Sequence, residues 1–304
     1  RRSRARLLPA VLALLTMGLL GWTLAGCSIS STAAAAGEPG RTRAIQNKGS
    51  DTMVNLALAW AEAYRNVAPD VDIAVTGGGS GTGIAALVNG TVDIANASRE
   101  MKEDEIADAQ AHGIDPQESI VAVDALAVIV NKRNPVSQLT IDQLSDIFSG
   151  RITNWKEVGG DDATIILVSR ESNSGTHVYF LEQVVRKGDS ENTDVFAPQT
   201  LLMPSSVGIT SEVQRNPHAI GYDGLGYVDA DTEKLIAVAK DADSPYVLPS
   251  VASGADGTYP ISRPLYMVTT GTPDTTIADY IAWIRGPEGQ AIVANLGFVP
   301  IPDE

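Results

Sequence analysis

Short apolar segments alternate with predicted helices along most of this chain, and the junctions between them share one kind of chemistry. The run 164–168 is β-branched and too short for a helix, so it predicts a buried strand, and segment 178–185 predicts a helix behind it. Three similar junctions occur earlier in the chain. This alternation predicts an α/β fold with mostly parallel sheets, in which ligands lie at the carboxyl ends of strands.

The junction after residue 168 is rich in groups that bind anions. We expect Ser174 to cap the following helix, and Gly175 lets the backbone approach a ligand closely. The first turn of a helix offers unpaired N–H groups and a positive dipole end, which suit a tetrahedral oxyanion. Arg170 adds a guanidinium that can hold two anion oxygens, and Thr176 adds a hydroxyl. Because serine caps are common, an ordinary capped helix beside a surface arginine explains this stretch equally well.

Two further junctions carry hydroxyl groups or an arginine. Ser50, Asp51 and Thr52 follow the first strand, where plain capping of the next helix by Ser50 or Asp51 is as good an explanation as ligand binding. Ser98 and Arg99 end the fourth strand. One capped helix is an ordinary feature, but several such junctions that converge predict one small oxyanion site between two lobes.

The remaining junction is a glycine-rich loop at residues 77–83, which contains Ser80. Residues 81–86 match the dinucleotide-binding pattern G-x-G-x-x-A, but the match is weak because the glycines begin before the matched frame. We prefer a loop whose free N–H groups and Ser80 hydroxyl face an anion.

The N-terminus predicts export. Four arginines precede an apolar segment at residues 7–20, and the sequence Leu-Ala-Gly-Cys ends at Cys27, the only cysteine. This pattern resembles a bacterial lipobox, which implies a signal peptide at 1–26, acylation of Cys27 and a flexible tether at 27–43. A retained transmembrane anchor is the alternative, although the apolar segment is shorter than the roughly 20 residues that a span needs.

The charge balance argues against nucleic acid as a partner. Removal of residues 1–26 lowers the Lys and Arg count from 22 to 18 against 37 Asp and Glu, which gives a mature net charge of −19. An anion site in such a chain must therefore work through locally aimed donors rather than through a globally positive field.

Several stretches together resemble the phosphate-binding protein of the bacterial high-affinity phosphate ABC transporter. The stretches that carry the resemblance are 77–83, 139–150, 170–176, 221–227, 287–290 and 297–300. The resemblance implies a two-lobed periplasmic-binding-protein fold of type II, with two chain crossovers and a ligand cleft between the lobes. Lobe I would comprise 44–124 plus 262–304, and lobe II would comprise 125–261.

The resemblance also implies a function and a site. The chain would be an extracytoplasmic, monomeric binding protein without a cofactor or metal, which hands inorganic phosphate to membrane permease subunits. Its phosphate site would contain Ser50, Thr52, Ser80, Ser98, Arg99, Arg170, Ser174, Gly175 and Thr176. Well-known members of this family place an aspartate at the position of Arg99, as acceptor for the proton on HPO₄²⁻. Asp51 is our candidate to replace that acceptor, and capping by Asp51 is the competing interpretation.

Two other functions remain open from the sequence. An exported phosphatase would need metal ligands or an activated nucleophile, but His112, His177 and His218 are dispersed, and no G-x-S-x-G elbow is present. We expect His177 to lie on a helix surface near the cap. A binding protein for sulfate, molybdate or tungstate would keep the fold and change only the anion.

Overall fold

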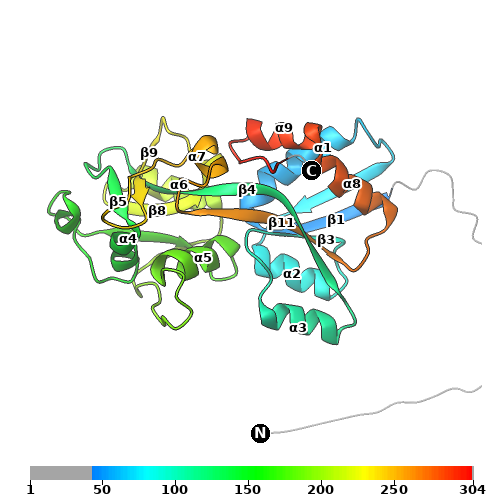
Figure 1. The fold of residues 1–304 in the computed structure, drawn as a ribbon, viewed down its shortest axis with the longest axis horizontal. Coiled ribbons are helices and arrows are strands. Elements are labelled where there is room, and N and C mark those ends of the chain that lie inside the picture. Colours follow the sequence, from blue (N-terminus) through cyan, green and yellow to red (C-terminus); the bar gives the residue numbers. More distant parts are fainter. Residues whose placement is uncertain (1–42, 303–304) are drawn as a thin grey trace, which may run out of the picture. The chain divides into compact units, whose positions relative to one another are not determined.

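A computed structural model describes residues 43–302 of the chain, which belong to one compact unit (Figure 1). The strands are β1 (Arg43–Gly49), β2 (Val71–Thr76), β3 (Ile94–Ala97), β4 (Pro116–Asn131), β5 (Gln138–Thr140), β6 (Ile166–Arg170), β7 (Leu201–Met203), β8 (Ala219–Gly224), β9 (Glu233–Leu235), β10 (Ala237–Ala239) and β11 (Ser262–Thr270). The α-helices are α1 (Val54–Tyr64), α2 (Ser80–Val88), α3 (Glu103–Ala111), α4 (Ile141–Phe148), α5 (Gly175–Phe180), α6 (Ser206–Arg215), α7 (Val251–Ala255), α8 (Thr275–Arg285) and α9 (Pro287–Asn295).

One long sheet organises this unit, with strands in the order β2-β1-β3-β11-β4-β8-β6-β7 and with β9 paired to β4. Parallel pairing joins β1 to β2 and β3, and it also joins β6 to β7 and β8. The predicted α/β fold is therefore confirmed. The prediction of mostly parallel pairing is wrong, because β11 pairs antiparallel with β3 and β4, and β4 pairs antiparallel with β8 and β9. The long strands β4 and β11 run antiparallel to each other, because the chain leaves one half of the sheet on β4 and returns on β11.

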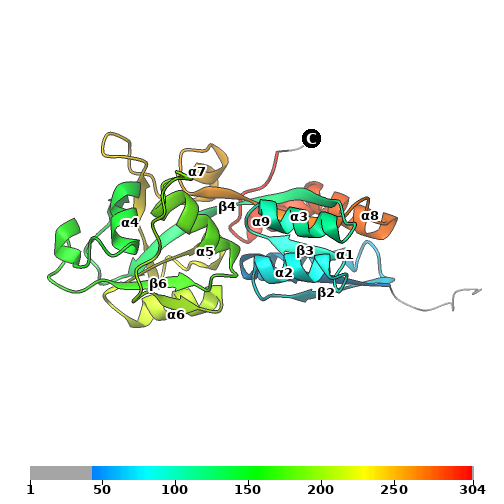
Figure 2. The same ribbon diagram turned by 90° about the horizontal axis from the view of Figure 1, so that it is seen from below.

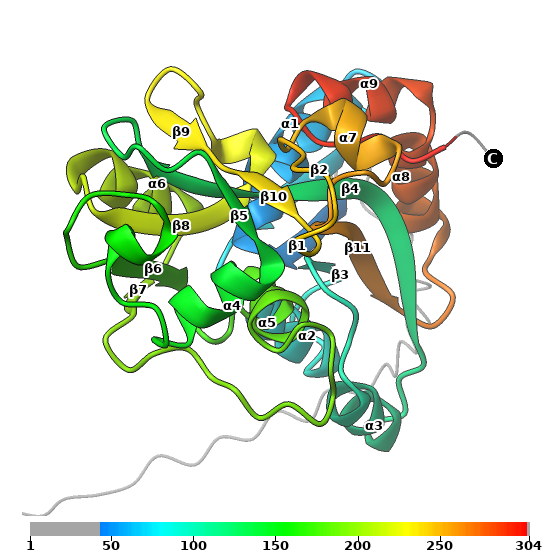
Figure 3. The same cartoon turned by 60° about the vertical axis from the view of Figure 1, so that its left-hand side comes forward.

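The strands β4 and β11 connect two groups of helices (Figures 1 and 2). Helices α1, α2, α3, α8 and α9 surround one part of the sheet, and α4, α5, α6 and α7 surround the other. The first part of β4 pairs with β11, and its second part pairs with β8. The view in Figure 3 also shows the separate two-stranded sheet of β5 and β10. The chain thus crosses twice between the two parts of the sheet, as expected.

The buried side chains form separate cores on the two sides of the crossing. One core is drawn from residues between 125 and 261 and contains Phe180 stacked on Tyr222, with ring centroids 3.7 Å apart. A second core is drawn from residues between 45 and 122 and between 265 and 298, and it contains Trp60 and Tyr280. Burial of these large aromatic side chains on each side gives each half of the sheet its own stabilising interior.

Some local expectations were wrong. The sequence of residues 226–228 predicts a strand, but Leu225–Tyr227 turns in a 3-10 helix directly after β8. Residues 241–258 are rich in Pro, Ser, Gly and Asp, which predicts a loop, but they contain α7. Ser250 caps this helix by accepting a hydrogen bond from the Ser253 amide. The amphipathic pattern at 139–148 predicts a helix capped by Thr140, and this prediction is confirmed, because Thr140 accepts a hydrogen bond from the Gln143 amide. Among the described helices, none is both long enough and apolar enough to cross a membrane.

Candidate functional site

The junction between β6 and α5 forms the centre of the candidate site. The Ser174 hydroxyl accepts a hydrogen bond of 3.2 Å from the Thr176 amide, which confirms that Ser174 caps α5. The helix begins at Gly175, earlier than predicted, and continues after Phe180 as a π-turn over Leu181–Val185. The cap fixes the backbone at Gly175, so this glycine faces the other junctions in a defined orientation.

Gly175 lies against two hydroxyl groups from distant parts of the sequence. A Cβ atom on Gly175 would be 2.4 Å from Ser80 Oγ and 2.6 Å from Ser98 Oγ. These two serine oxygens are 3.3 Å apart, and the Ser98 amide donates to Ser80 Oγ at 3.1 Å. Ser80 begins α2 and Ser98 follows β3, so the structure brings three of the four junctions to one place.

The first junction reaches the same place through Thr52. Its hydroxyl oxygen is 2.8 Å from the hydroxyl oxygen of Thr176, and both residues are buried. Ser50 is also buried, and its amide donates to the Asn96 carbonyl at 2.8 Å, which ties the first junction to β3. All four junctions therefore converge, and the convergence places hydroxyl donors from four separate chain segments around one point.

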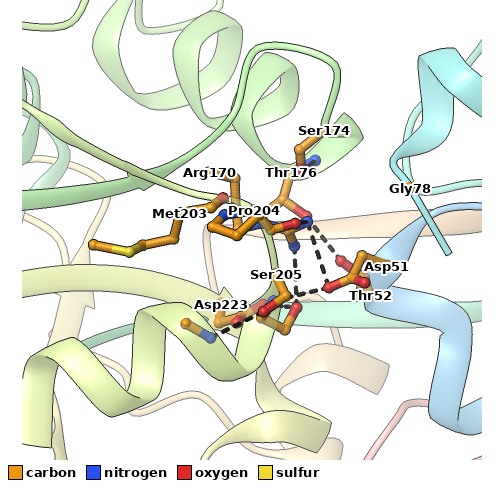
Figure 4. Close-up of polar contacts among 12 residues, drawn as sticks. Asp51, Thr52, Gly78, Arg170, Ser174, Thr176, Met203, Pro204, Ser205 and Asp223 are labelled. Carbon is orange, nitrogen blue, oxygen red and sulfur yellow. Dashed lines mark hydrogen bonds and ion pairs between the residues drawn. The ribbon is translucent and has the colours of Figure 1, made fainter.

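Arg170 is buried at the end of β6 and is held by several acceptors. Its Nη1 donates to Ser206 Oγ at 3.1 Å, and its Nη2 donates to the Pro204 carbonyl at 3.1 Å and lies 3.4 Å from Asp51 Oδ2. Its Nε donates to the Met203 carbonyl at 3.3 Å. Figure 4 shows Arg170 directed toward Asp51, beside Thr52 and Thr176. These contacts orient the guanidinium within the group of converging junctions.

Asp51 does not cap the helix that follows it. Its Oδ2 instead accepts a hydrogen bond of 2.8 Å from the amide of Ser206, the first residue of α6. Neither Ser50 nor Asp51 makes a side-chain cap bond, so the capping interpretation is wrong for both. The physical reason is the neighbouring Arg170 and the positive end of α6, which attract the carboxylate across to the other part of the sheet.

Arg99 is paired within its own region. Its two Nη atoms donate to the carboxylate oxygens of Glu105 at 2.7 and 2.6 Å, and Nη1 also donates to the Glu100 carbonyl. Its Nη2 nevertheless lies 3.8 Å from the position that a Cβ would take on Gly81, in the glycine-rich loop. Arg99 thus lies at the edge of the four converging junctions, and Glu105 accepts hydrogen bonds from both of its terminal nitrogens.

The structure adds polar residues that the sequence motifs did not indicate. Ser206 links Arg170 to Asp223, because its hydroxyl donates to Asp223 Oδ1 at 2.9 Å. Asp223 is fully buried, and this burial raises its pKa to about 7 even though Arg170 lowers it. Asp124 and Arg263 form another buried pair at 2.9 Å. A charged residue inside an apolar strand, such as Asp124 in 121–130, could have indicated these buried polar residues from the sequence.

His177 is half-buried rather than placed on a helix surface as expected. Its Nδ1 lies 2.8 Å from the Arg170 carbonyl and 3.2 Å from Ser169 Oγ, and its ring packs against Phe196. Desolvation lowers the pKa of His177, because burial disfavours the charged imidazolium. Across residues 43–302, no three His, Cys, Asp or Glu side chains are grouped so that they could hold a metal ion.

Comparison with known proteins places this chain in a family. A model of the PBP superfamily domain matches residues 33–288. The phosphate-binding protein PstS of Pseudomonas aeruginosa is 35% identical over 275 residues, which cover 85% of this chain and 83% of that protein. The phosphate-binding protein PstS of Bacillus subtilis is 32% identical over 90% of this chain and 86% of its own length.

A solved structure from the same family is also similar to this chain in fold and sequence. The crystal structure of a phosphate ABC transporter substrate-binding protein candidate from Clostridium perfringens, with bound phosphate, is similar with a TM-score of 0.76. The two sequences are 33% identical, and the match covers 86% of this chain and 100% of that one. The chain belongs to the PBP superfamily and, within it, to the family of phosphate-binding proteins PstS.

Proposed function

We propose that the chain captures inorganic phosphate outside the cytoplasm and delivers it to the permease subunits of an ABC transporter. The convergence of hydroxyl groups from four strand-to-helix junctions around Gly175 is the observation that carries this proposal. Its relatives are named as phosphate-binding proteins, so the chain is a solute-binding protein and not an enzyme. The phosphatase and the other oxyanions are not favoured.

The proposed site lies between two lobes, with lobe I at 44–124 plus 262–304 and lobe II at 125–261. Support comes from hydrogen bonds that cross this division. The Gly81 amide donates to the Asn173 carbonyl at 3.1 Å, and the Asn173 side chain donates to the Gly78 carbonyl at 3.0 Å. The Tyr227 hydroxyl donates to the Asp51 carbonyl at 2.8 Å. These contacts would hold the lobes together around a bound anion.

The residues proposed to surround phosphate share hydroxyl, amide or guanidinium donors. They are Ser50, Thr52, Ser80, Ser98, Arg170, Ser174, Gly175 and Thr176. We assign Arg99 a supporting role at the edge of the site, because it would have to release Glu105 before it could bind the anion directly. Such a dense set of donors can replace the water around a small dianion.

Phosphate should stabilise the folded protein, and this effect tests the proposal. A ligand that binds only the native state adds about 2.7 kcal/mol at one hundred times its Kd. For a chain of this size, the melting temperature should rise by at least about 5 °C. The measurement is a thermal melt of protein stripped of bound anion, with and without phosphate. An unchanged melting temperature at millimolar phosphate would refute the proposal.

Asp51 is the proposed acceptor for the proton of HPO₄²⁻. Its side chain is 21% exposed and lies 3.4 Å from Arg170, so a carboxylate stands beside the donors of the site. Sulfate has no proton to share, and the carboxylate would repel it. We expect that sulfate begins to compete with phosphate in an Asp51→Asn protein at neutral pH. Continued exclusion of sulfate by the folded variant would assign selectivity to another group.

We also propose that Cys27 carries a lipid that anchors the exported, monomeric protein to the membrane. The support is the sequence alone, since residues 1–42 lie outside the described residues. A Cys27→Ser variant should be released from membranes or remain unprocessed. Fractionation and gel migration identical to the wild type would refute the anchor, and light scattering of the soluble part would test the monomer.

A further inference from the structure

A buried ion pair joins the two crossover strands beside the anion site. Asp124 on β4 and Arg263 on β11 are register partners in the antiparallel pair. Arg263 Nη2 donates to Asp124 Oδ2 at 2.9 Å, and both side chains are almost completely buried. Burial of two charges costs several kcal/mol of desolvation for each ion, which the attraction within the pair offsets only in good geometry. A gain in stability therefore does not by itself explain why this pair is buried.

Arg263 also contacts the proposed site directly. Its Nη2 donates to Thr176 Oγ1 at 2.8 Å, and Thr176 Oγ1 lies 2.8 Å from Thr52 Oγ1. A guanidinium can only donate, so Thr176 must use one lone pair to accept from Arg263. The two threonines share one hydrogen between them, which leaves one O–H hydrogen of the pair for another acceptor. Arg263 thus biases the hydroxyl pair toward donation.

The guanidinium of Arg263 also has unused donors. Within residues 43–302, Arg263 Nη1 is buried and has no hydrogen-bond partner, and the same holds for Asp124 Oδ1. Buried polar groups in native proteins nearly always have partners, so an unpaired guanidinium nitrogen calls for an explanation. A bound anion close to Thr176 would supply the acceptor that Nη1 lacks.

We propose that Arg263, positioned by Asp124, is a second arginine of the anion site and favours doubly charged phosphate over the singly charged form. This inference rests on the proposed phosphate site. The positive charge favours the dianion, and the donor bias of the Thr176–Thr52 pair favours an anion oxygen without a proton. The proton of HPO₄²⁻ is then directed to an oxygen elsewhere in the site, in agreement with an acceptor near Arg170.

The charged surroundings of Arg263 are mixed. The guanidinium lies 5.5 Å from the centre of the Tyr179 ring. Arg263 also lines a cavity of about 440 Å³, and the other charged residues that line this cavity are Arg99, Glu100, Lys102, Glu103 and Glu182. Asp124 is the acidic group bonded to Arg263, and Arg99 is bonded to Glu105. Replacement of both residues leaves the net charge unchanged but removes the guanidinium donors beside Thr176, and this loss should lower the preference for the dianion.

The test compares the wild type with an Asp124→Asn/Arg263→Gln double variant, which removes both charges and leaves no uncompensated buried ion. Calorimetry of anion-stripped protein should measure phosphate affinity below and above the second pKa of phosphate. We expect a loss of about tenfold to a hundredfold above that pKa and a smaller loss below it. The matched control is Asp146→Asn/Arg151→Gln, which removes a half-exposed pair and should leave both affinities unchanged.

The outcomes are distinct. A folded double variant with wild-type phosphate affinity both below and above the pKa would show that the pair is only structural. An equal loss of affinity below and above the pKa would refute the proposal that Arg263 favours the dianion. If the double variant does not fold, Arg263→Lys keeps the charge but loses the planar fork. That variant should bind more weakly and keep its preference for the dianion, and unchanged binding would overturn the inference. Absence of phosphate binding by the wild type would instead overturn the proposed function, and with it this inference.

Discussion

At the scale of single residues, Gly175 decides how closely the junctions can approach. A methyl group there would lie 2.4 Å from Ser80 Oγ, which real Cβ atoms do not tolerate. We expect Gly175→Ala to force the β6–α5 junction away from both serines. Phosphate binding should weaken by about a hundredfold, which corresponds to a loss of about 2.8 kcal/mol at about 1.4 kcal/mol for each factor of ten. Calorimetry checks the affinity, and a thermal melt should show that the variant remains folded. Retained affinity would mean that the hydroxyl groups do not surround the ligand.

Asp223 predicts a pH dependence of stability. Burial raises its pKa from 3.8 to about 7 in the folded protein. The folded state therefore keeps a proton that the unfolded state loses, so the free energy of unfolding falls as pH rises from 3.8 to about 7 and levels off above that range. In an Asp223→Asn protein this decline should shrink by about 1–4 kcal/mol.

Urea denaturation of phosphate-free protein across that pH range measures the Asp223 effect. The control is Asp243→Asn, which changes an exposed carboxylate in a loop and should keep the wild-type slope. An identical slope in Asp223→Asn would contradict the assignment of the decline to Asp223.

The residues of the site could be predicted from the sequence only in part. Hydroxyl groups and glycine at strand-to-helix junctions leave a local signature, so Thr52, Ser80 and Thr176 were expected. Asp124 and Arg263 lie within apolar strands 139 residues apart, and only the antiparallel pairing of β4 with β11 brings them together. The sequence also could not predict which group the Asp51 side chain contacts, because an aspartate can equally cap its own helix or contact a distant one.

At the scale of elements, the loop before α5 forms a bridge to the glycine-rich loop before α2. The Asn173 side chain donates to the Gly78 carbonyl at 3.0 Å. We expect Asn173→Ala to weaken this bridge and to raise the phosphate dissociation rate by about tenfold, with little change in the association rate. Stopped-flow measurements check both rates.

The control for the bridge is Asn192→Ala, which removes an amide that donates to the Arg186 carbonyl within the same segment. That variant should release phosphate at the wild-type rate. An unchanged dissociation rate in Asn173→Ala would show that the side chain does not help to keep the bound state closed.

The elements themselves were largely predictable, because their hydrophobic patterns are strong. The apolar spacing in α1 and the apolar run at 121–130 of β4, which only Asp124 interrupts, identify their types. The exceptions are short elements whose conformation depends on tertiary contacts. Leu225–Tyr227 has a strand-like composition, but it turns after β8, and Tyr227 donates to the Asp51 carbonyl. The π-turn after α5 has no signal in the sequence either.

At the scale of the whole molecule, a strongly acidic chain is proposed to bind an anion. The sequence carries a net charge of −15, so long-range attraction does not explain phosphate binding. Near the site, the two buried arginines Arg170 and Arg263 contact the acidic residues Asp51 and Asp124. Affinity must come from short, aimed hydrogen bonds, which predicts that phosphate binding depends only weakly on salt.

The most direct test of the central proposal is calorimetric titration of anion-stripped protein with phosphate at neutral pH, repeated in excess sulfate. We expect that one phosphate binds per chain and that sulfate does not displace it, because an acceptor within the site requires the proton that only phosphate carries. Absence of a binding heat, or equal competition by sulfate, would contradict it.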